Sequence, residues 1–293
     1  MRIRRTDTSI GATIDDVDLA ELDSAAFRDI YRAWLEASVL RFRDQVLTKE
    51  KLQAFSERFG PLEYAPMGKI TDEQRANVPN PFVTNISNII EDGRPLGGLG
   101  SGEANWHTDM SYIPAPPAAT ILYAKEVPVG DDGQILGDTL FASTAAAYDA
   151  LPQNLKERLH GRRTTHSYEA KHMRRAQEGK SNRKPITKAQ RDSLPPVKHP
   201  VIRRHPVSGS PCIFVVAGEC VGIDGIPDDE AAEVLEMLAQ HTVKPDFHYR
   251  HKWQRGDVLI WDNCLVQHLA MHAYALPQRR LMLRTTVKGT VPN

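Results

Sequence analysis

The stretch NWHTDMSY, residues 105–112, decides how the rest of this sequence is interpreted. Side chains alternate between the two faces of an extended backbone, so His107 and Asp109 are expected to point the same way. An imidazole and a carboxylate suit a borderline divalent metal, and with a third ligand they form the open site of non-heme Fe(II) oxygenases. A His-x-Asp triplet also arises by chance in a chain with 11 histidines, so its weight depends on the other segments.

Length and composition describe an ordinary globular chain. It has 293 residues, of which 41% are hydrophobic and 25% charged, enough to bury a large core as one domain. Lys+Arg and Asp+Glu both number 37, so no net charge favours nucleic acid or an anionic membrane. The three cysteines lack CxxC spacing, and we find neither an apolar leader nor a membrane span. We therefore expect a cytoplasmic protein without a membrane partner.

The hydrophobic pattern predicts a β-rich core with flanking helices. One helix is expected with Ser24 as its N-cap and a second is expected to open at Thr48, because apolar residues recur there at helical spacing. Strands are expected at 39–42, 82–86, 118–127, 137–141, 212–217, 247–253, 258–263 and 281–287. The strands 118–127 and 137–141 are separated by a polar turn and are expected to pair with each other. Many strands and few helices favour barrel-like closure, which removes exposed strand edges.

Residues 160–211 are irregular in pattern and rich in Lys and Arg. Basic clusters can bind phosphate backbones, but Tyr168 is the one aromatic residue in this segment, so base stacking has little support. We interpret the segment as a basic, solvated lid or insertion. A nucleic-acid-binding protein remains the alternative, and it would show salt-dependent binding of DNA or RNA.

Five pieces of the chain resemble one enzyme family. The pieces NWHTDMSY, PPAATILYAKEVP, GDTLF, GDVLIWDNCLVQH and LPQRRLMLRTTVKG are similar to the taurine/2,4-dichlorophenoxyacetate dioxygenase (TauD/TfdA) family. The similarity spans nearly the whole chain in the same order and is loosest at 160–211. It implies a mainly β, α+β fold in which a single domain, residues 1–293, has a double-stranded β-helix (jelly-roll, cupin-like) core. It also implies a possible homo-oligomer.

The same resemblance implies the reaction. Fe(II) is the metal, 2-oxoglutarate the cosubstrate and O2 the oxidant, and the cosubstrate is converted to succinate and CO2. A small organic substrate is hydroxylated, and hydroxylation can lead to its cleavage. The cofactor carries the difficult chemistry, while the protein supplies position and excludes water.

The resemblance also implies which residues hold the metal. They are His107, Asp109 and a distal histidine, for which His268 and His272 are the candidates. We choose His268 because it directly follows the Trp-Asp-Asn-x-x-x-Gln frame, whereas His272 belongs to the next loop. A zinc protein using Cys264 and His268 is an alternative, although no second Cys/His pair with suitable spacing completes four ligands.

Three further residues match positions that contact the cosubstrate. Arg284 matches the arginine that binds the distal carboxylate of 2-oxoglutarate, and a planar guanidinium suits such a two-pronged pair. Thr139 matches a hydroxyl that touches the same carboxylate. Arg280 matches a second arginine near the cosubstrate, with a surface ion pair as its alternative interpretation.

Residues flanking the ligands bear on the substrate. Trp106 and Tyr112 are expected to wall the pocket, with core packing as the alternative. Glu103 stands where taurine-using members carry an amide, and the segment PLEYAPMG has Tyr64 but no histidine, so taurine is not expected to be the substrate. A small carboxylate-bearing molecule is the default, although Glu103 would repel an anion.

Overall fold

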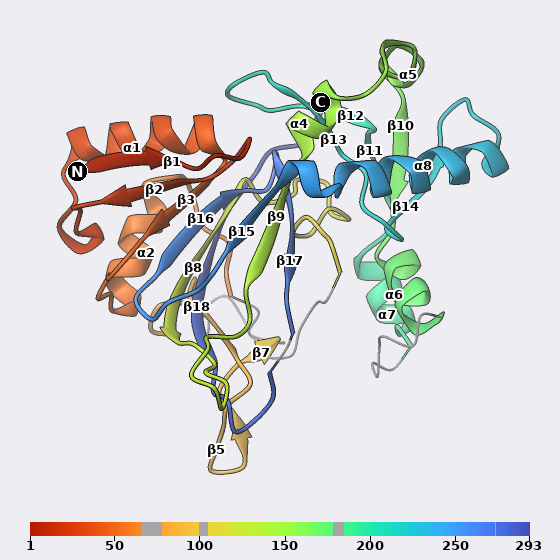
Figure 1. Ribbon diagram of the computed structural model, residues 1–293. Coiled ribbons are helices and arrows are strands. Elements are labelled where there is room, and N and C mark those ends of the chain that lie inside the picture. Colours follow the sequence, from red (N-terminus) through yellow and green to blue (C-terminus); the bar gives the residue numbers. More distant parts are fainter. Residues whose placement is uncertain (66–77, 100–104, 178–184, 273) are drawn as a thin grey trace.

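Two facing β-sheets form the centre of the molecule, and helices flank them (Figure 1). The computed structural model describes residues 1–65, 78–99, 105–177, 185–272 and 274–293. Within these ranges no helix combines the length and the apolar character that crossing a membrane requires.

Within the described residues the major sheet has eight strands. In spatial order they are β1 (Arg2–Arg5), β2 (Ala12–Asp15), β3 (Val39–Phe42), β16 (Val258–Asp262), β8 (Ala119–Glu126), β18 (Leu281–Val287), β4 (Thr84–Ser87) and β7 (Gly98–Leu99). Two pairs, β2 with β3 and β4 with β7, are parallel, and the other neighbours are antiparallel. The central strands β16 and β8 are mostly buried and rich in branched residues, as expected for strands covered on both faces.

The minor sheet consists of β15 (His248–His251), β9 (Thr139–Ser143) and β17 (Val266–Ala270), with β9 in the middle. Apolar side chains of the two sheets meet in one buried cluster. In this cluster the ring centroids of Phe141 on β9 and Trp261 on β16 are 5.6 Å apart. The predicted mainly β, jelly-roll architecture with flanking helices is confirmed.

Helices α1 (Ser24–Ala37) and α2 (Lys49–Glu57) pack their apolar faces on the outer side of the major sheet. The side chain of Asp23, rather than the expected Ser24, caps α1 by accepting from the Ala26 N–H at 2.7 Å. Thr48 caps α2 as predicted. An oxygen-bearing cap satisfies a backbone N–H that has no partner within the helix.

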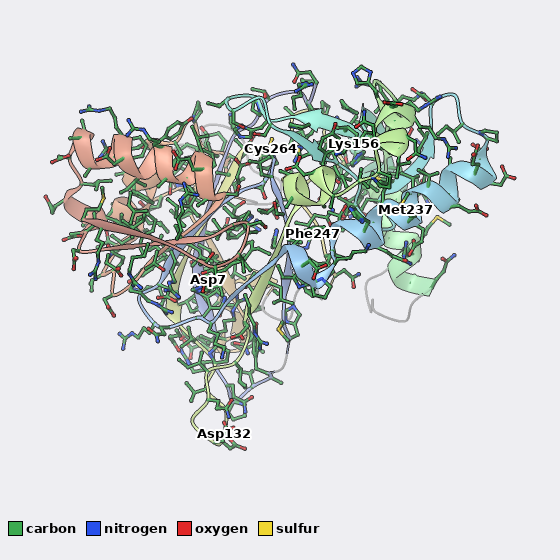
Figure 2. All side chains as sticks on the ribbon, turned by 45° about the horizontal axis from the view of Figure 1, so that its top comes forward. Asp7, Asp132, Lys156, Met237, Phe247 and Cys264 are labelled. Atoms are coloured by element: carbon green, nitrogen blue, oxygen red, sulfur yellow. The ribbon has the colours of Figure 1, made fainter. Side chains whose placement is uncertain are left out.

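The expected pairing of 118–127 with 137–141 is wrong. β8 pairs with β16 and β18 in the major sheet, whereas β9 pairs with β15 and β17 in the minor sheet. The polar turn between β8 and β9 therefore carries the chain from one sheet to the other. The turn residue Asp132 and Cys264, which follows β16, lie far apart in the molecule (Figure 2).

Much of the segment 160–211 is integral to the fold, so the interpretation as a solvated lid needs correction. β11 (Val197–Pro200), β10 (Arg163–His166) and β14 (Cys220–Ile223) form a sheet beside the two main sheets. Val201 and Arg203 in this segment are at most 3% exposed. Helices that complete this side of the molecule are α4 (Thr144–Asp149), α5 (Gln153–Leu159), α6 (Tyr168–Gln177), α7 (Lys188–Ser193) and α8 (Asp228–Thr242).

Several basic side chains of this segment are neutralised by acids. Ion pairs join Arg174 to Glu236, Arg191 to Glu169 and Lys188 to Asp192. Such pairing weakens the electrostatic case for a nucleic-acid surface. The remaining elements are the hairpins β5 (Ile90–Glu91) with β6 (Arg94–Pro95) and β12 (Ile202–Arg204) with β13 (Pro211–Ile213), and the short helices η1 (Leu19–Glu21) and η2 (Pro245–Phe247).

Candidate metal and cosubstrate site

His107 and His268 are held side by side by their backbones. The His107 N–H donates to the His268 carbonyl at 3.1 Å, and the His268 N–H donates to the His107 carbonyl at 2.8 Å. This isolated bridge attaches the 105–112 stretch to β17 and leaves the two imidazole centroids 4.1 Å apart. The chain then turns at Met110, whose φ of 48° is left-handed, so the stretch is extended only up to the ligands.

Asp109 completes a three-residue group. Its Oδ1 lies 4.0 Å from His107 Nε2, and the donor atoms of His107, Asp109 and His268 all lie within 4.8 Å of one another. These separations suit ligands of one ion, since donor atoms bound to a metal at about 2 Å are a few ångströms apart. Burial raises the pKa of Asp109, but the charges of His268, Arg284 and His107 and a Thr120 hydrogen bond outweigh it and lower this pKa to about 2. Asp109 therefore carries a negative charge at neutral pH, as a metal-binding carboxylate requires.

Thr139 is the first residue of β9, and Arg280 directly precedes β18, whose first residue pairs with the last residue of β8. Thr139 accepts a hydrogen bond from Trp253 Nε1 at 3.0 Å and is 4% exposed. Arg280 is also 4% exposed, and its guanidinium lies 5.9 Å from the ring centroid of Tyr274. A Cβ added to Gly137, two residues before β9, would come within 2.8 Å of that same ring, so Arg280 and the end of the β8–β9 turn are both neighbours of Tyr274. Within the described ranges no carboxylate pairs with Arg280, although burial lowers its pKa.

Arg284, unlike Arg280, lies near the candidate metal ligands. It pairs with Leu122 in the β18–β8 register, two residues from Thr120, whose hydroxyl donates to Asp109 at 2.6 Å. Its charge is among those that lower the pKa of Asp109. Arg280 therefore places a positive charge at the start of β18. Arg284 places a second one near Asp109.

The other predicted site residues within the described ranges pack against rings that do not belong to the ligand group. Trp106 packs on His248 with ring centroids 4.8 Å apart, and Tyr112 packs on Tyr168 at 4.9 Å. His272 does not belong to the ligand group and lies 6.0 Å from the Tyr274 ring. Glu103 lies outside the described residues.

An unpredicted set of contacts fastens the turn that follows Asp109. Ser111 Oγ donates to Glu219 Oε2 at 2.5 Å, and Lys171 Nζ lies 2.7 Å from Glu219 Oε1. His199 Nε2 donates to the Ile113 carbonyl at 3.0 Å. The Lys171 and Glu219 side chains are only 11% and 2% exposed. The segment after β9 therefore helps to position the 105–112 stretch.

Replacing Glu219 by glutamine is expected to lower the free energy of unfolding by about 3 kcal/mol, because the charge of Lys171 loses its buried partner. Urea unfolding measures this change. The control is Glu236→Gln, which breaks the exposed pair with Arg174 and should cost about 1 kcal/mol or less. Equal effects of the two variants would contradict a structural role for the buried pair.

Cys264 and His268 do not share a site. Cys264 groups with His205 and Asp262, whereas His268 groups with His107 and Asp109. The zinc alternative built on Cys264 and His268 is therefore wrong.

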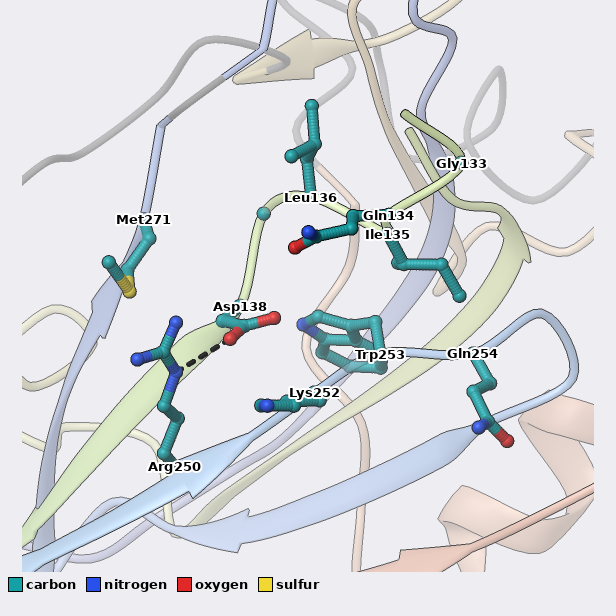
Figure 3. Close-up of a pocket in the computed structure, with 11 residues that line it drawn as sticks. Gly133, Gln134, Ile135, Leu136, Asp138, Arg250, Lys252, Trp253, Gln254 and Met271 are labelled. Atoms are coloured by element: carbon teal, nitrogen blue, oxygen red, sulfur yellow. Dashed lines mark hydrogen bonds and ion pairs between the residues drawn. The ribbon is translucent and has the colours of Figure 1, made fainter. Parts of the chain in front are cut away.

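A cavity of about 480 Å³ lies beside the start of β9, lined by the turn residues 133–138 and by residues 250 and 252–254 (Figure 3). Trp253, Leu136 and Met271 supply its apolar lining, and an ion pair of 2.6 Å joins Asp138 to Arg250 in it. None of the three candidate metal ligands lines this cavity. It is separate from the ligand group.

Two histidines and one carboxylate on a jelly-roll scaffold define the class of non-heme metal oxygenases. Comparison with known proteins gives the family. Residues 2–286 match the model of the family "Taurine catabolism dioxygenase TauD, TfdA family", and the chain belongs to it. It is thus a 2-oxoglutarate-dependent dioxygenase, an oxidoreductase.

Individual relatives are similar over their full lengths. The chain is 36% identical to the alpha-ketoglutarate-dependent 2,4-dichlorophenoxyacetate dioxygenase of Cupriavidus pinatubonensis, covering 96% of this chain and 95% of that one. It is 30% identical to the (S)-phenoxypropionate/alpha-ketoglutarate-dioxygenase of Sphingobium herbicidovorans, covering 97% and 93%. The crystal structure of AAD-2 in complex with Mn(II) and N-oxalylglycine superposes with a TM-score of 0.80 at 29% identity, covering 99% of both chains.

Proposed function

We propose that this dioxygenase uses Fe(II), 2-oxoglutarate and O2 to hydroxylate a small molecule that bears a carboxylate. The products are the hydroxylated substrate, succinate and CO2. The observation that carries the proposal is the group formed by His107, Asp109 and His268, whose donor atoms lie within 4.8 Å of one another.

The donor set fits the metal that the family uses. Two imidazoles and one carboxylate are the ligands of the facial triad, which leaves positions for a cosubstrate and O2. When bound, Fe(II) would supply the redox chemistry that couples O2 to oxidation of 2-oxoglutarate and of a substrate C–H bond. The protein residues bind and orient the reactants around it.

Arg280 and Thr139 are suited to the distal carboxylate of 2-oxoglutarate. When the 2-oxo acid end of this five-carbon molecule is at the metal, its other carboxylate lies away from the metal. Arg280 is a buried cation without a carboxylate partner in the described ranges, so an anion there offsets its desolvation cost. The Thr139 hydroxyl accepts from Trp253, which leaves its own proton free to donate to that anion.

Arg284 is suited to a second anion nearer the metal. Its charge acts on Asp109, so a carboxylate held by Arg284 would place the adjoining carbon of the substrate close to the reaction centre. The sequence assigned Arg284 to 2-oxoglutarate, and the surroundings of the two arginines favour dividing the roles between them. This division supports an acidic substrate.

A screen for succinate release would test the substrate class. Aryloxyalkanoates, alkyl sulfates, amino-acid derivatives and taurine are incubated with enzyme, Fe(II), 2-oxoglutarate and O2. We expect turnover of a carboxylate-bearing compound and little or none of taurine. Efficient taurine turnover would contradict the proposed substrate class, and the absence of 2-oxoglutarate binding would contradict the proposed function itself.

A further inference from the structure

A chain of buried hydrogen bonds runs from β16 to Asp109. Trp261 Nε1 donates to Asn263 Oδ1 at 3.0 Å, and Asn263 Nδ2 donates to Thr120 Oγ1 at 3.0 Å. Thr120 Oγ1 in turn donates to Asp109 Oδ2 at 2.6 Å. Trp261, Asn263 and Thr120 are at most 3% exposed, so water does not compete for these bonds.

The two ends of this chain fix its direction. An indole N–H can only donate, and an ionised carboxylate can only accept. The Asn263 amide must therefore turn its oxygen to Trp261 and its NH2 group to Thr120. The single hydroxyl proton of Thr120 is then directed to Asp109 Oδ2.

This direction determines which oxygen of Asp109 is left for a metal. Oδ2 accepts from Thr120, whereas Oδ1 is the oxygen 4.0 Å from His107 Nε2. A carboxylate that bound through both oxygens would occupy a position that the cosubstrate or O2 requires. We propose that the Trp261–Asn263–Thr120 chain holds Asp109 as a one-oxygen ligand. Thr120 and Asn263 are thus positioning residues, an inference that rests on the proposed function.

The fold anchors this chain at its β16 end. Trp261 on β16 lies directly opposite Thr120 on β8 in the sheet, so the series of hydrogen bonds crosses between two central strands. Asp262 is held by His205, whose Nε2 lies 2.9 Å from Oδ2, and by the Cys264 N–H at 2.7 Å from Oδ1. The buried His205–Asp262 pair therefore fixes the turn that carries Asn263.

The test compares Mn(II) and Co(II) binding by wild-type protein and by Thr120→Val, which removes the hydroxyl and keeps the shape. Loss of an interaction behind a metal ligand typically costs about 10- to 100-fold in metal affinity, and we expect a loss in that range. The visible spectrum of bound Co(II) should also change, because Asp109 can then rotate and bind through both oxygens. Thr120→Ser should restore both readouts, since it restores the hydroxyl.

The control is Thr242→Val on α8. The Thr242 hydroxyl is also fully buried, and it donates to the Leu238 carbonyl at 2.7 Å. This variant should lose stability without changing metal affinity or the Co(II) spectrum. If Thr120→Val does not fold, Asn263→Asp gives the same test, because it removes the NH2 donor to Thr120 at constant shape.

The outcomes separate this inference from the proposed function. Metal binding by the wild type together with unchanged affinity and spectrum in Thr120→Val or Asn263→Asp would overturn the inference alone. Failure of Thr120→Ser to restore the readouts would overturn it too. Failure of the wild type to bind either metal would instead overturn the proposed function.

Discussion

Replacing His268 by alanine is expected to abolish metal-dependent 2-oxoglutarate turnover while the fold remains. His268 supplies one of three donor atoms in the ligand group. Because changes behind a ligand already cost about 10- to 100-fold in metal affinity, loss of a ligand should cost more than about 100-fold. The two hydrogen bonds between His107 and His268 are made by backbone atoms and persist in the variant. Mn(II) calorimetry and circular dichroism measure the two effects, and His107→Ala and Asp109→Ala should behave alike.

The control for this prediction is His272→Ala. His272 was the rival third ligand in the sequence, and in the structure it packs near Tyr274 outside the ligand group. Metal binding should be retained in this variant. Retention of the metal in His268→Ala together with its loss in His272→Ala would reverse the choice of ligand.

The ligand group was predictable because its signals are local in the sequence. His107 and Asp109 are two residues apart, and the frame before His268 places that residue on a strand. The structure brings the three together as expected, although by a single bridge followed by a turn rather than by a regular strand. The left-handed backbone conformation of Met110 could not be predicted from the sequence, because methionine has no preference for that conformation.

Long-range pairing was not predictable in the same way. The hydrophobic pattern identified the segments of β8 and β9 as strands, but it does not specify a partner. β8 is paired by two strands from the C-terminal third, and burial of both its faces decides that arrangement. The Ser111–Glu219 bond likewise joins residues 108 positions apart, and a serine and a glutamate give no sign of such a contact.

Replacing Arg280 by alanine is expected to weaken 2-oxoglutarate binding by several hundred-fold or more. Removing one partner of a desolvated ion pair costs on the order of 3–5 kcal/mol, and each 1.4 kcal/mol is about tenfold in affinity. The effect should appear in an anaerobic titration of the Fe(II) enzyme with 2-oxoglutarate, followed by the metal-to-ligand charge-transfer band. The control is Arg279→Ala, whose exposed side chain pairs with Glu126 and Glu91 and should leave binding unchanged.

Arg284→Ala distinguishes the two arginines in the same titration. If Arg284 holds the substrate anion, this variant should keep most of its 2-oxoglutarate affinity and lose affinity for the acidic substrate. The fraction of succinate that is released without hydroxylation of the substrate should then rise, because the substrate carbon is no longer held near the metal. An Arg284 variant that loses 2-oxoglutarate while Arg280→Ala retains it would instead restore the assignment made from the sequence. The positions of the two charges, one near the Tyr274 ring and one near Asp109, favour the first outcome.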